Sequence, residues 1–548
     1  MGNYYTITRL KRHLNRQFPK GNLPRRTRMK FLKSMTKKDK FIYLLTLVYL
    51  IPFFVLVTTN MLFSMFQTTY MELYQDTEKP LYKTDSPLLL LALTALFLFF
   101  CFFIFKKKEI TPRLCTLLER TALVWTVIIS LFIIFLFRVR VSCDSGHLSN
   151  IAISFLKGDY SEFLGDGYLA HYPHQLGMIG LFQIVYYLFG IENFIVLQLL
   201  NVVAIFSAVY YLHRITEELF PQLQVRVILS LLCMGLLPLY LYSTFIYGDI
   251  PGLGLVLPAM YYVIRYLNTK RKLYALPAAL CMAFAIVLKS NNSVILIAVI
   301  LILLLHAIQS KDKFAVLFSI LLICSPSLIN TGINSYYAHA AGLDSIPSGI
   351  PKIAWVAMGL QENGYIENGW YNGYNWGIYT QNNHNADATT EACISSIKDS
   401  FSNFVSAPKS GLHFFYKKFI SQWNDPGYQA QITVEWYSRH RDDHSKLALY
   451  LIYGNGRFLV EGIMNLYHFM LLLGSSIFAF FSLWEKKPAN TLLSLSVFGG
   501  YFFHLIWEAG GRYGLGYFVM CVPMAAWGFC KLTELISSSV KRLRKKEG

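Results

Sequence analysis

The sequence is poor in charged residues. Asp, Glu, Lys and Arg make up 15% of its 548 residues, well below the roughly one quarter that is usual in soluble globular domains. Apolar residues make up 54% of the chain. A soluble protein of this length would not need so much apolar sequence, so the composition argues against one.

Among the charged residues the acidic ones are the fewer. The 50 Lys and Arg against 31 Asp and Glu give a formal net charge of +19. A nucleic-acid-binding protein would gather such an excess on one surface. Here the basic residues instead abut apolar runs, at 9–40, 106–108, 270–272, 311–313, 486–487 and 541–546. Basic clusters at the ends of membrane spans mark the cytoplasmic side. We therefore attribute the charge to membrane topology and expect no nucleic acid partner.

Cysteine provides no disulfide framework. Six of the nine cysteines lie in apolar runs, where a thiol behaves as a small apolar group: Cys101, Cys233, Cys281, Cys324, Cys521 and Cys530. Cys143 and Cys393 fall in predicted outer loops, and the sequence leaves open whether these two pair.

Long apolar runs are what the sequence has in abundance. Inside lipid the backbone must satisfy its own hydrogen bonds, so a run near the roughly 20 residues that cross the bilayer must be a helix. No small-residue cleavage site follows the first run, so we expect no cleaved signal peptide. We predict an α-helical polytopic membrane protein of about twelve spans, with both termini cytoplasmic: 41–66, 87–105, 121–140, 193–213, 226–245, 251–268, 273–288, 293–309, 314–333, 458–483, 490–507 and 512–535.

These spans divide the chain into parts. We expect a basic tail, two N-terminal spans, a central membrane module, an extracytoplasmic domain, C-terminal spans and a second basic tail, at 1–40, 41–120, 121–333, 334–457, 458–540 and 541–548. In the outer loop 141–192, apolar residues recur at helical spacing over 148–156, and a second apolar stretch covers 171–190. We predict two short interfacial helices there. The extracytoplasmic domain is rich in aromatics, which predicts an ordered fold, with mixed secondary structure.

Two acidic residues lie in tight loops on the predicted outer face. Asp144 follows the third span in Val-Ser-Cys-Asp-Ser-Gly-His, and Asp249 lies in Tyr-Gly-Asp-Ile-Pro. Each suits the start of a helix, which is the plain structural alternative. A carboxylate at the membrane edge can also accept a proton from a substrate hydroxyl. Their shared membrane side suggests that both face one cavity.

Cationic residues are predicted on the same face. Lys289 ends the seventh span, where Lys is unusual because basic residues collect at cytoplasmic ends. With the donors Asn291 and Asn292 it suits a phosphate, and snorkelling of its side chain is the alternative. Glu508 and Arg512 have the spacing of a helical ion pair; otherwise Arg512 meets a phosphate and Glu508 orients it.

Histidines gather in the predicted outer segments. Asp144, His171 and His174 are candidate ligands for a divalent metal ion, although scattered loop histidines are the commoner explanation of such a pattern.

Together these segments resemble the GT-C superfamily of membrane glycosyltransferases, which includes protein O-mannosyltransferases, the lipid A aminoarabinose transferase and oligosaccharyltransferases. The resemblance rests on Asp144 in the first large outer loop, the 172–177 segment, the loop of Asp249 and the span end at Lys289. It covers about residues 121–333. Glu508, Arg512, Tyr513 and the 423–425 segment look like those of bacterial members that decorate cell-surface polymers.

The resemblance implies a polyprenyl-phosphate sugar donor, catalytic roles for Asp144 and Asp249, and neutralisation of the lipid phosphate by Lys289 and Arg512. Many relatives carry a second acidic residue beside the first-loop aspartate; here the neighbours are cysteine and serine, which weakens the case for a metal ion. The residues expected around the substrate are His147, Tyr172, His174, Gln175, Glu508, Tyr513 and Trp423.

The sequence thus predicts an inverting glycosyltransferase of the plasma membrane that acts on an extracytoplasmic acceptor, such as a cell-wall polysaccharide or teichoic acid. A phosphate leaving group needs no proton donor, but its growing charge needs cations. Without a sizeable cytoplasmic domain to hold a nucleotide sugar, a lipid donor is favoured. The alternatives are a protein O-glycosyltransferase, a transporter or flippase of lipid-linked glycans, which would place charges near mid-membrane, and a non-catalytic assembly partner.

Overall fold

The computed structural model describes residues 36–74, 77–107, 109–362, 364, 366–439, 443–483 and 488–547. The chain divides into two units, Met1–Val48 and Tyr49–Gly548. In the first unit the described residues form the start of helix α3 (Lys37–Phe66), where the Thr36 hydroxyl accepts a hydrogen bond from the Asp39 backbone N–H at 3.1 Å. The division into parts that the sequence suggested stays a prediction, and most of the 1–40 tail lies outside the described residues.

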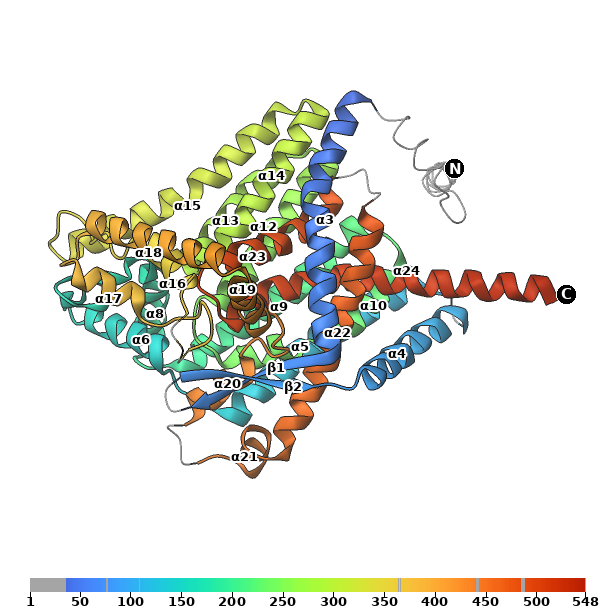
Figure 1. Cartoon of the computed structure of the whole chain (residues 1–548), viewed down its shortest axis with the longest axis horizontal. Coiled ribbons are helices and arrows are strands. Elements are labelled where there is room, and N and C mark those ends of the chain that lie inside the picture. The colour runs from blue at the N-terminus through green and yellow to red at the C-terminus, as the bar shows by residue number, and fades with distance from the viewer. Residues whose placement is uncertain are drawn as a thin grey trace. The chain divides into compact units, whose positions relative to one another are not determined.

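Each predicted span falls on a helix or, for 226–245, on a bent helix pair (Figure 1): α3, α4 (Pro87–Lys107), α5 (Pro112–Phe137), α9 (Phe194–Leu219), α10 (Leu223–Met234) with α11 (Leu237–Leu241) and η3 (Tyr242–Thr244), α12 (Asp249–Thr269), α13 (Ala275–Leu288), α14 (Ser293–Ser310), α15 (Lys313–Ala340), α22 (Asn455–Ser482), α23 (Leu492–Ile506) and α24 (Leu515–Glu547). Within the described ranges, nine helices are long and apolar enough to cross a bilayer, and the bent pair is a tenth candidate. Helices α13 and α23 have 14 and 15 residues. The helical membrane fold is confirmed, and the count of twelve stays a prediction.

Small residues bring the membrane helices close together. A Cβ added to Gly254 of α12 would lie 2.7 Å from the Cα of Ala204 in α9, and one added to Gly474 of α22 would lie 2.7 Å from the Cα of Ala525 in α24. Helices in lipid are held by such close packing and not by the burial of apolar surface from water. These contacts build the rigid frame that positions the loops between the helices.

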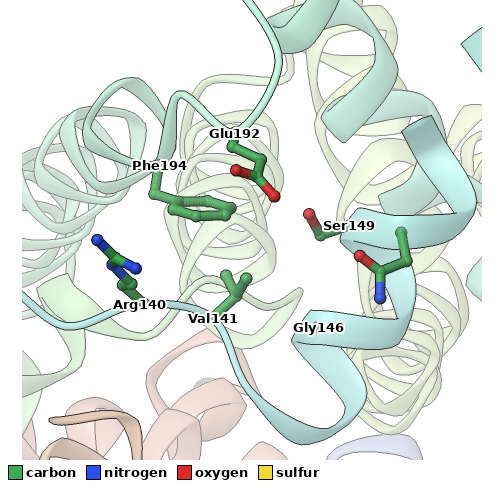
Figure 2. A pocket seen from close by; sticks show the side chains of 7 residues that line it. Arg140, Val141, Gly146, Ser149, Glu192 and Phe194 are labelled. Carbon is green, nitrogen blue, oxygen red and sulfur yellow. The ribbon is translucent and has the colours of Figure 1, made fainter. Parts of the chain in front are cut away.

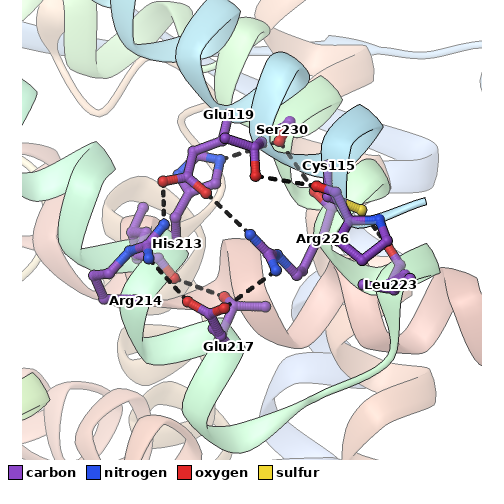
Figure 3. A network of polar contacts seen from close by, with 12 residues as sticks. Cys115, Glu119, His213, Arg214, Glu217, Leu223, Arg226 and Ser230 are labelled. Atoms are coloured by element: carbon purple, nitrogen blue, oxygen red, sulfur yellow. Dashed lines mark hydrogen bonds and ion pairs between the residues drawn. The ribbon is translucent and has the colours of Figure 1, made fainter. Parts of the chain in front are cut away.

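A partly buried ion network joins α5, α9 and α10 (Figure 3). Glu119 of α5 accepts hydrogen bonds from Arg214 of α9 and from Arg226 of α10, the latter at 3.3 Å. Glu217 pairs with the same two arginines at 2.9 and 3.1 Å. Glu119 lies near the start of α5, and the other end of that helix leads to Asp144. Because each charge is matched, the network acts as a clamp at the end of the bundle remote from Asp144.

The 141–192 loop forms two short helices, as the sequence predicted, and their interfacial position stays a prediction. They are α6 (Cys143–Leu156) and α8 (Leu176–Phe189), and between them lie η1 (Ser161–Phe163), α7 (Tyr168–His171) and η2 (Pro173–Gln175). Helix α6 packs on α8 and buries Leu148, Ile151 and Phe155. The apolar face of α6 is therefore covered at least in part by protein.

The outer segment 334–457 is helical, which corrects the expectation of mixed secondary structure. Its described residues form the end of α15 and then α16 (Ile353–Gly359), α17 (Tyr374–Gln381), α18 (Ala386–Ser406), α19 (Pro408–Trp423), α20 (Ala430–Ser438) and α21 (Lys446–Ile452). Local start signals explain the helices: the Asn385 side chain caps α18, and Pro408 opens α19. An isolated β-bridge links Trp370 of this segment to Ala509.

A β-hairpin between the first two spans was not predicted. Strands β1 (Gln67–Tyr74) and β2 (Thr77–Thr84) pair in antiparallel fashion. The backbone N–H of Thr69 donates to the carbonyl of Asn424 at 3.1 Å, which ties the hairpin to the end of α19.

No disulfide joins Cys143 and Cys393. Cys393 is buried in α18, whereas Cys143 is exposed at the start of α6.

Candidate functional site

Asp249 and Lys289 form an ion pair where two membrane helices end. Asp249 is the first residue of α12, and Lys289 follows the last residue of α13. The Lys289 Nζ lies 3.1 Å from Asp249 Oδ2, and the two side chains are only 15% and 10% exposed. A Cβ on Gly248 would collide with the Leu288 carbonyl, so glycine is needed for this approach. Burial lowers the pKa of the Lys289 ammonium, and the Asp249 charge opposes that shift.

Arg512 lies beside this pair, over the same aromatic rings. Its guanidinium carbon is 5.2 Å from the ring centre of Tyr247 and 5.4 Å from those of Phe245 and Tyr513. The Lys289 Nζ lies 4.8 Å from the Tyr247 ring centre and 5.2 Å from that of Tyr513. The electron-rich ring faces attract both cations and hold them close despite their like charge. Two adjacent cations suit the oxygens of a phosphate.

Glu508 brings a third carboxyl group to the two cations. It is 8% exposed and accepts a hydrogen bond from the Tyr513 hydroxyl at 3.1 Å. Burial raises the pKa of Glu508 to about 7; the Tyr513 hydrogen bond and the charges of Arg512 and Lys289 lower it, and the charge of Asp144 raises it. Glu508 therefore interacts electrostatically with Arg512, Lys289 and Asp144.

The sequence suggested a helical ion pair between Glu508 and Arg512. In the structure Glu508 instead contacts the Tyr513 hydroxyl. Helix α23 ends at Ile506, and Gly510 has extended backbone with a φ of 178°. The two residues are therefore not one helical turn apart.

Asp144 is the exposed member of the group. It is the second residue of α6, whose N-cap is Ser142, so the helix dipole favours its negative charge. The adjacent Ser145 is buried and shares a hydrogen bond with the Tyr437 hydroxyl at 3.2 Å, which anchors the start of the helix. The charge of Asp144 also adds to the pKa of Tyr172, which burial raises well above its ordinary value.

The 172–175 segment lies close to the ion pair. Gln175 Nε2 donates to the Tyr247 hydroxyl at 2.5 Å. Burial and the nearby charge of Lys289 lower the pKa of His174 to about 4, so its imidazole is neutral at pH 7. Tyr172, which precedes these residues, lies 6.1 Å from His174 between ring centres.

Three more residues that the sequence predicted at the site are His147, Asn291 and Asn292. His147 is exposed and its ring stacks on Tyr168 at 5.6 Å. Asn292 donates from its amide to the Ala285 carbonyl at 2.9 Å and so closes the turn after α13. Asn291 lies beside it, partly buried, in the short helix η5 (Ser290–Asn292).

Trp423 is a core residue, which corrects its placement among the substrate contacts. It is 3% exposed, and its ring lies 4.2 Å from that of Tyr501 and 5.9 Å from that of Tyr517. Apolar packing accounts for its position.

The metal set considered from the sequence does not come together. Helix α7 ends at His171, whose ring stacks on Trp376 with 3.5 Å between ring centres, whereas the His174 ring lies 6.1 Å from that of Trp355. The group with metal-ligand spacing that the described residues contain includes His171 but neither Asp144 nor His174.

Hydrogen bonds from residues that the sequence had mostly not indicated support the backbone of Arg512. The Gln429 Oε1 accepts a hydrogen bond from the Arg512 backbone N–H at 2.7 Å, and its Nε2 donates to Glu78 of β2. The Gln429 backbone N–H donates to Asp425 Oδ2 at 2.7 Å. Burial raises the pKa of Asp425 to about 7. Only Asp425 lay in a segment that the sequence had singled out.

A cavity of about 400 Å³ opens beside α6 (Figure 2). It is lined by Arg140, Val141, Gly146, Ser149, Asn150, Glu192 and Phe194. Gly146 lies one turn or less from Asp144 on the same helix. A cation, an anion and polar side chains in the lining suit a hydrophilic molecule.

Residues 178–329 match a protein-family model described as dolichyl-phosphate-mannose-protein mannosyltransferase. The match supports a GT-C membrane glycosyltransferase. The matched stretch runs from α8 into α15 and contains Asp249 and Lys289, while Asp144 and Arg512 lie outside it. The glycosyltransferase is a multi-pass membrane enzyme that uses a lipid-linked sugar. Among curated proteins, no significant match is found.

Proposed function

We propose that this glycosyltransferase moves a sugar, with inversion, from a polyprenyl-phosphate donor to a hydroxyl group of an extracytoplasmic acceptor. The acceptor class that we propose is a cell-wall or cell-surface polymer. The observation that carries the proposal is the pairing of Lys289 and Arg512 over the Tyr247 and Tyr513 rings, with Asp144 close enough to act electrostatically on Arg512 and Glu508.

The chemistry follows from these charges. The acceptor oxygen attacks the anomeric carbon, the bond from that carbon to the phosphate oxygen breaks, and polyprenyl phosphate leaves with the electron pair. Lys289 and Arg512 stabilise the negative charge that grows on the phosphate. Asp144 takes the acceptor proton as general base. Attack on the face opposite to the leaving group inverts the anomeric centre.

Asp249 has a positioning role in this scheme. Its ion pair holds the Lys289 ammonium at 3.1 Å, and its charge opposes the lowering of the Lys289 pKa that burial causes. The cavity beside α6 offers a hydrophilic acceptor a route toward Asp144.

We place the enzyme in the plasma membrane with both termini in the cytoplasm. Support comes from helix ends: Asp249 starts α12, and the basic residues Lys270, Arg271 and Lys272 follow its other end. Basic residues favour the cytoplasmic side, which puts Asp249 outside.

A protein acceptor is the second candidate, because the description of the matching family names protein mannosyltransferases. Purified full-length protein is incubated with a labelled polyprenyl-phosphate sugar and either a cell-wall polymer or a peptide rich in Ser and Thr. Label on the polymer, with an inverted anomeric centre by NMR, supports the proposal, and label on the peptide favours the second candidate. Glycan composition of cells with and without the gene identifies the native acceptor. If the protein moves the lipid across vesicles but transfers no label to any acceptor, the proposal is overturned in favour of a flippase.

A further inference from the structure

A second group of potential ligands lies where the 141–192 loop meets the outer helices. Asp166 precedes α7, His171 ends α7, and His384 lies between α17 and α18. One ligand atom from each side chain lies within 4.8 Å of the other two. No residue of this group belongs to the Lys289–Asp249 site.

His171 is arranged as metal-binding histidines are. It is fully buried, and its Nδ1 lies 3.0 Å from the Gly167 carbonyl, which can only accept, so Nδ1 carries the proton and Nε2 the lone pair. That Nε2 is buried without a hydrogen-bond partner. A backbone carbonyl on one ring nitrogen commonly fixes the other nitrogen for a metal. Trp376 stacks on the ring within 5° of parallel and holds its plane.

His384 and Asp166 face the same point. The His384 Nε2 lies 3.1 Å from Asp166 Oδ1, yet its direction does not make a hydrogen bond. Two ligands on a tetrahedral zinc ion, each about 2.0–2.1 Å from the metal, lie roughly 3.3 Å apart. The rings of His384 and His171 are nearly perpendicular, at 85° and 5.0 Å between centres. Asp166 is 75% exposed, so its carboxylate is free to close on an ion.

We propose that Asp166, His171 and His384 bind a divalent transition-metal ion, with Zn²⁺ the ion that two imidazoles and one carboxylate suit best. Water completes the coordination on the exposed side. The ion joins the 141–192 loop to the segment between α17 and α18. Tyr172 directly follows His171, so the ion steadies the 172–175 segment that reaches the Tyr247 hydroxyl. Its role is to position this segment and not to take part in sugar transfer.

The test measures metal binding, which does not depend on the proposed function. Full-length protein in detergent is stripped with a chelator, then titrated with ZnCl₂ while bound zinc and the unfolding temperature are followed; Co²⁺ replaces Zn²⁺ for visible absorption. We expect about one equivalent per chain, a rise in Tm, and a tetrahedral Co²⁺ spectrum.

Variants decide where the metal binds. His384→Gln and Asp166→Asn should each weaken binding by at least the roughly 10-fold to 100-fold that loss of a residue supporting a ligand costs. His413→Gln, at an exposed histidine on α19, should bind as the parent does. His171 is left intact because its buried ring supports packing. The proposal is overturned if the parent binds no zinc after stripping, or if His384→Gln binds it as tightly as His413→Gln does.

Discussion

Lys289 lies 3.1 Å from Asp249 although 40 positions separate the two residues in the chain. The pair lies where α12 begins and α13 ends, and both side chains are mostly buried. A buried ion pair adds little to stability compared with an apolar pair, but removal of one partner leaves an uncompensated charge. The pair is therefore a sensitive point of the fold as well as of the proposed site.

Removal of one charge of the Lys289–Asp249 pair should lower the free energy of unfolding more than removal of both charges. We expect Lys289→Met to lower the free energy of unfolding by about 3 kcal/mol or more, and Lys289→Met with Asp249→Asn to recover part of that loss. Thermal unfolding in detergent measures both, and Lys398→Met, on the exposed face of α18, is the control. Equal stability of the single and double variants would show that the pair is not coupled.

Arg512 should not be replaceable by lysine. The guanidinium spans three aromatic rings and presents a planar set of donors, which an ammonium cannot do. Arg512→Lys should reduce kcat/KM for the lipid donor by about 10-fold to 100-fold, the worth of one charged hydrogen bond. Arg113→Lys, exposed at the start of α5, is the matched control. Unchanged kinetics in Arg512→Lys would remove Arg512 from the phosphate site.

Glu508 should make stability depend on pH. Its pKa is about 7 when folded and ordinarily 4.5, so the folded protein keeps a proton that the unfolded chain has lost. The free energy of unfolding therefore falls as pH rises between these values, by up to about 1.4 kcal/mol per pH unit, and levels off above the folded pKa. In Glu508→Gln this component is absent. Unfolding curves at several pH values should diverge between the two proteins below about pH 7; parallel curves would contradict the assignment.

Trp423 should behave as a core residue. Trp423→Ala removes a buried ring and should lower the free energy of unfolding by about 3–5 kcal/mol, whereas Trp125→Ala, at a position that is 40% exposed, should cost less. A small loss of stability together with a raised KM for the acceptor would return Trp423 to the substrate site.

The helices were predictable because lipid leaves the backbone no alternative. Asp249, Lys289 and Arg512 were predictable for a related reason, since charges at the ends of apolar helices are conspicuous. Glu78 and Gln429 were not, because a strand and a loop reach Arg512 only through tertiary packing.

Elsewhere the sequence could not show in which direction a side chain points. His171 and His174 are three positions apart, but α7 ends at His171 and η2 begins at Pro173, so the rings have different neighbours. Composition likewise could not tell the buried Trp423 from an exposed aromatic.

The most direct measurement separates donor binding from transfer in Asp144→Asn. The account predicts that this variant binds polyprenyl phosphate as the parent does, because Lys289 and Arg512 are intact, while sugar transfer falls by about 100-fold to 10,000-fold. Asp344→Asn, an exposed aspartate outside the site, should lose neither. Transfer at the parental rate by folded Asp144→Asn would contradict the account.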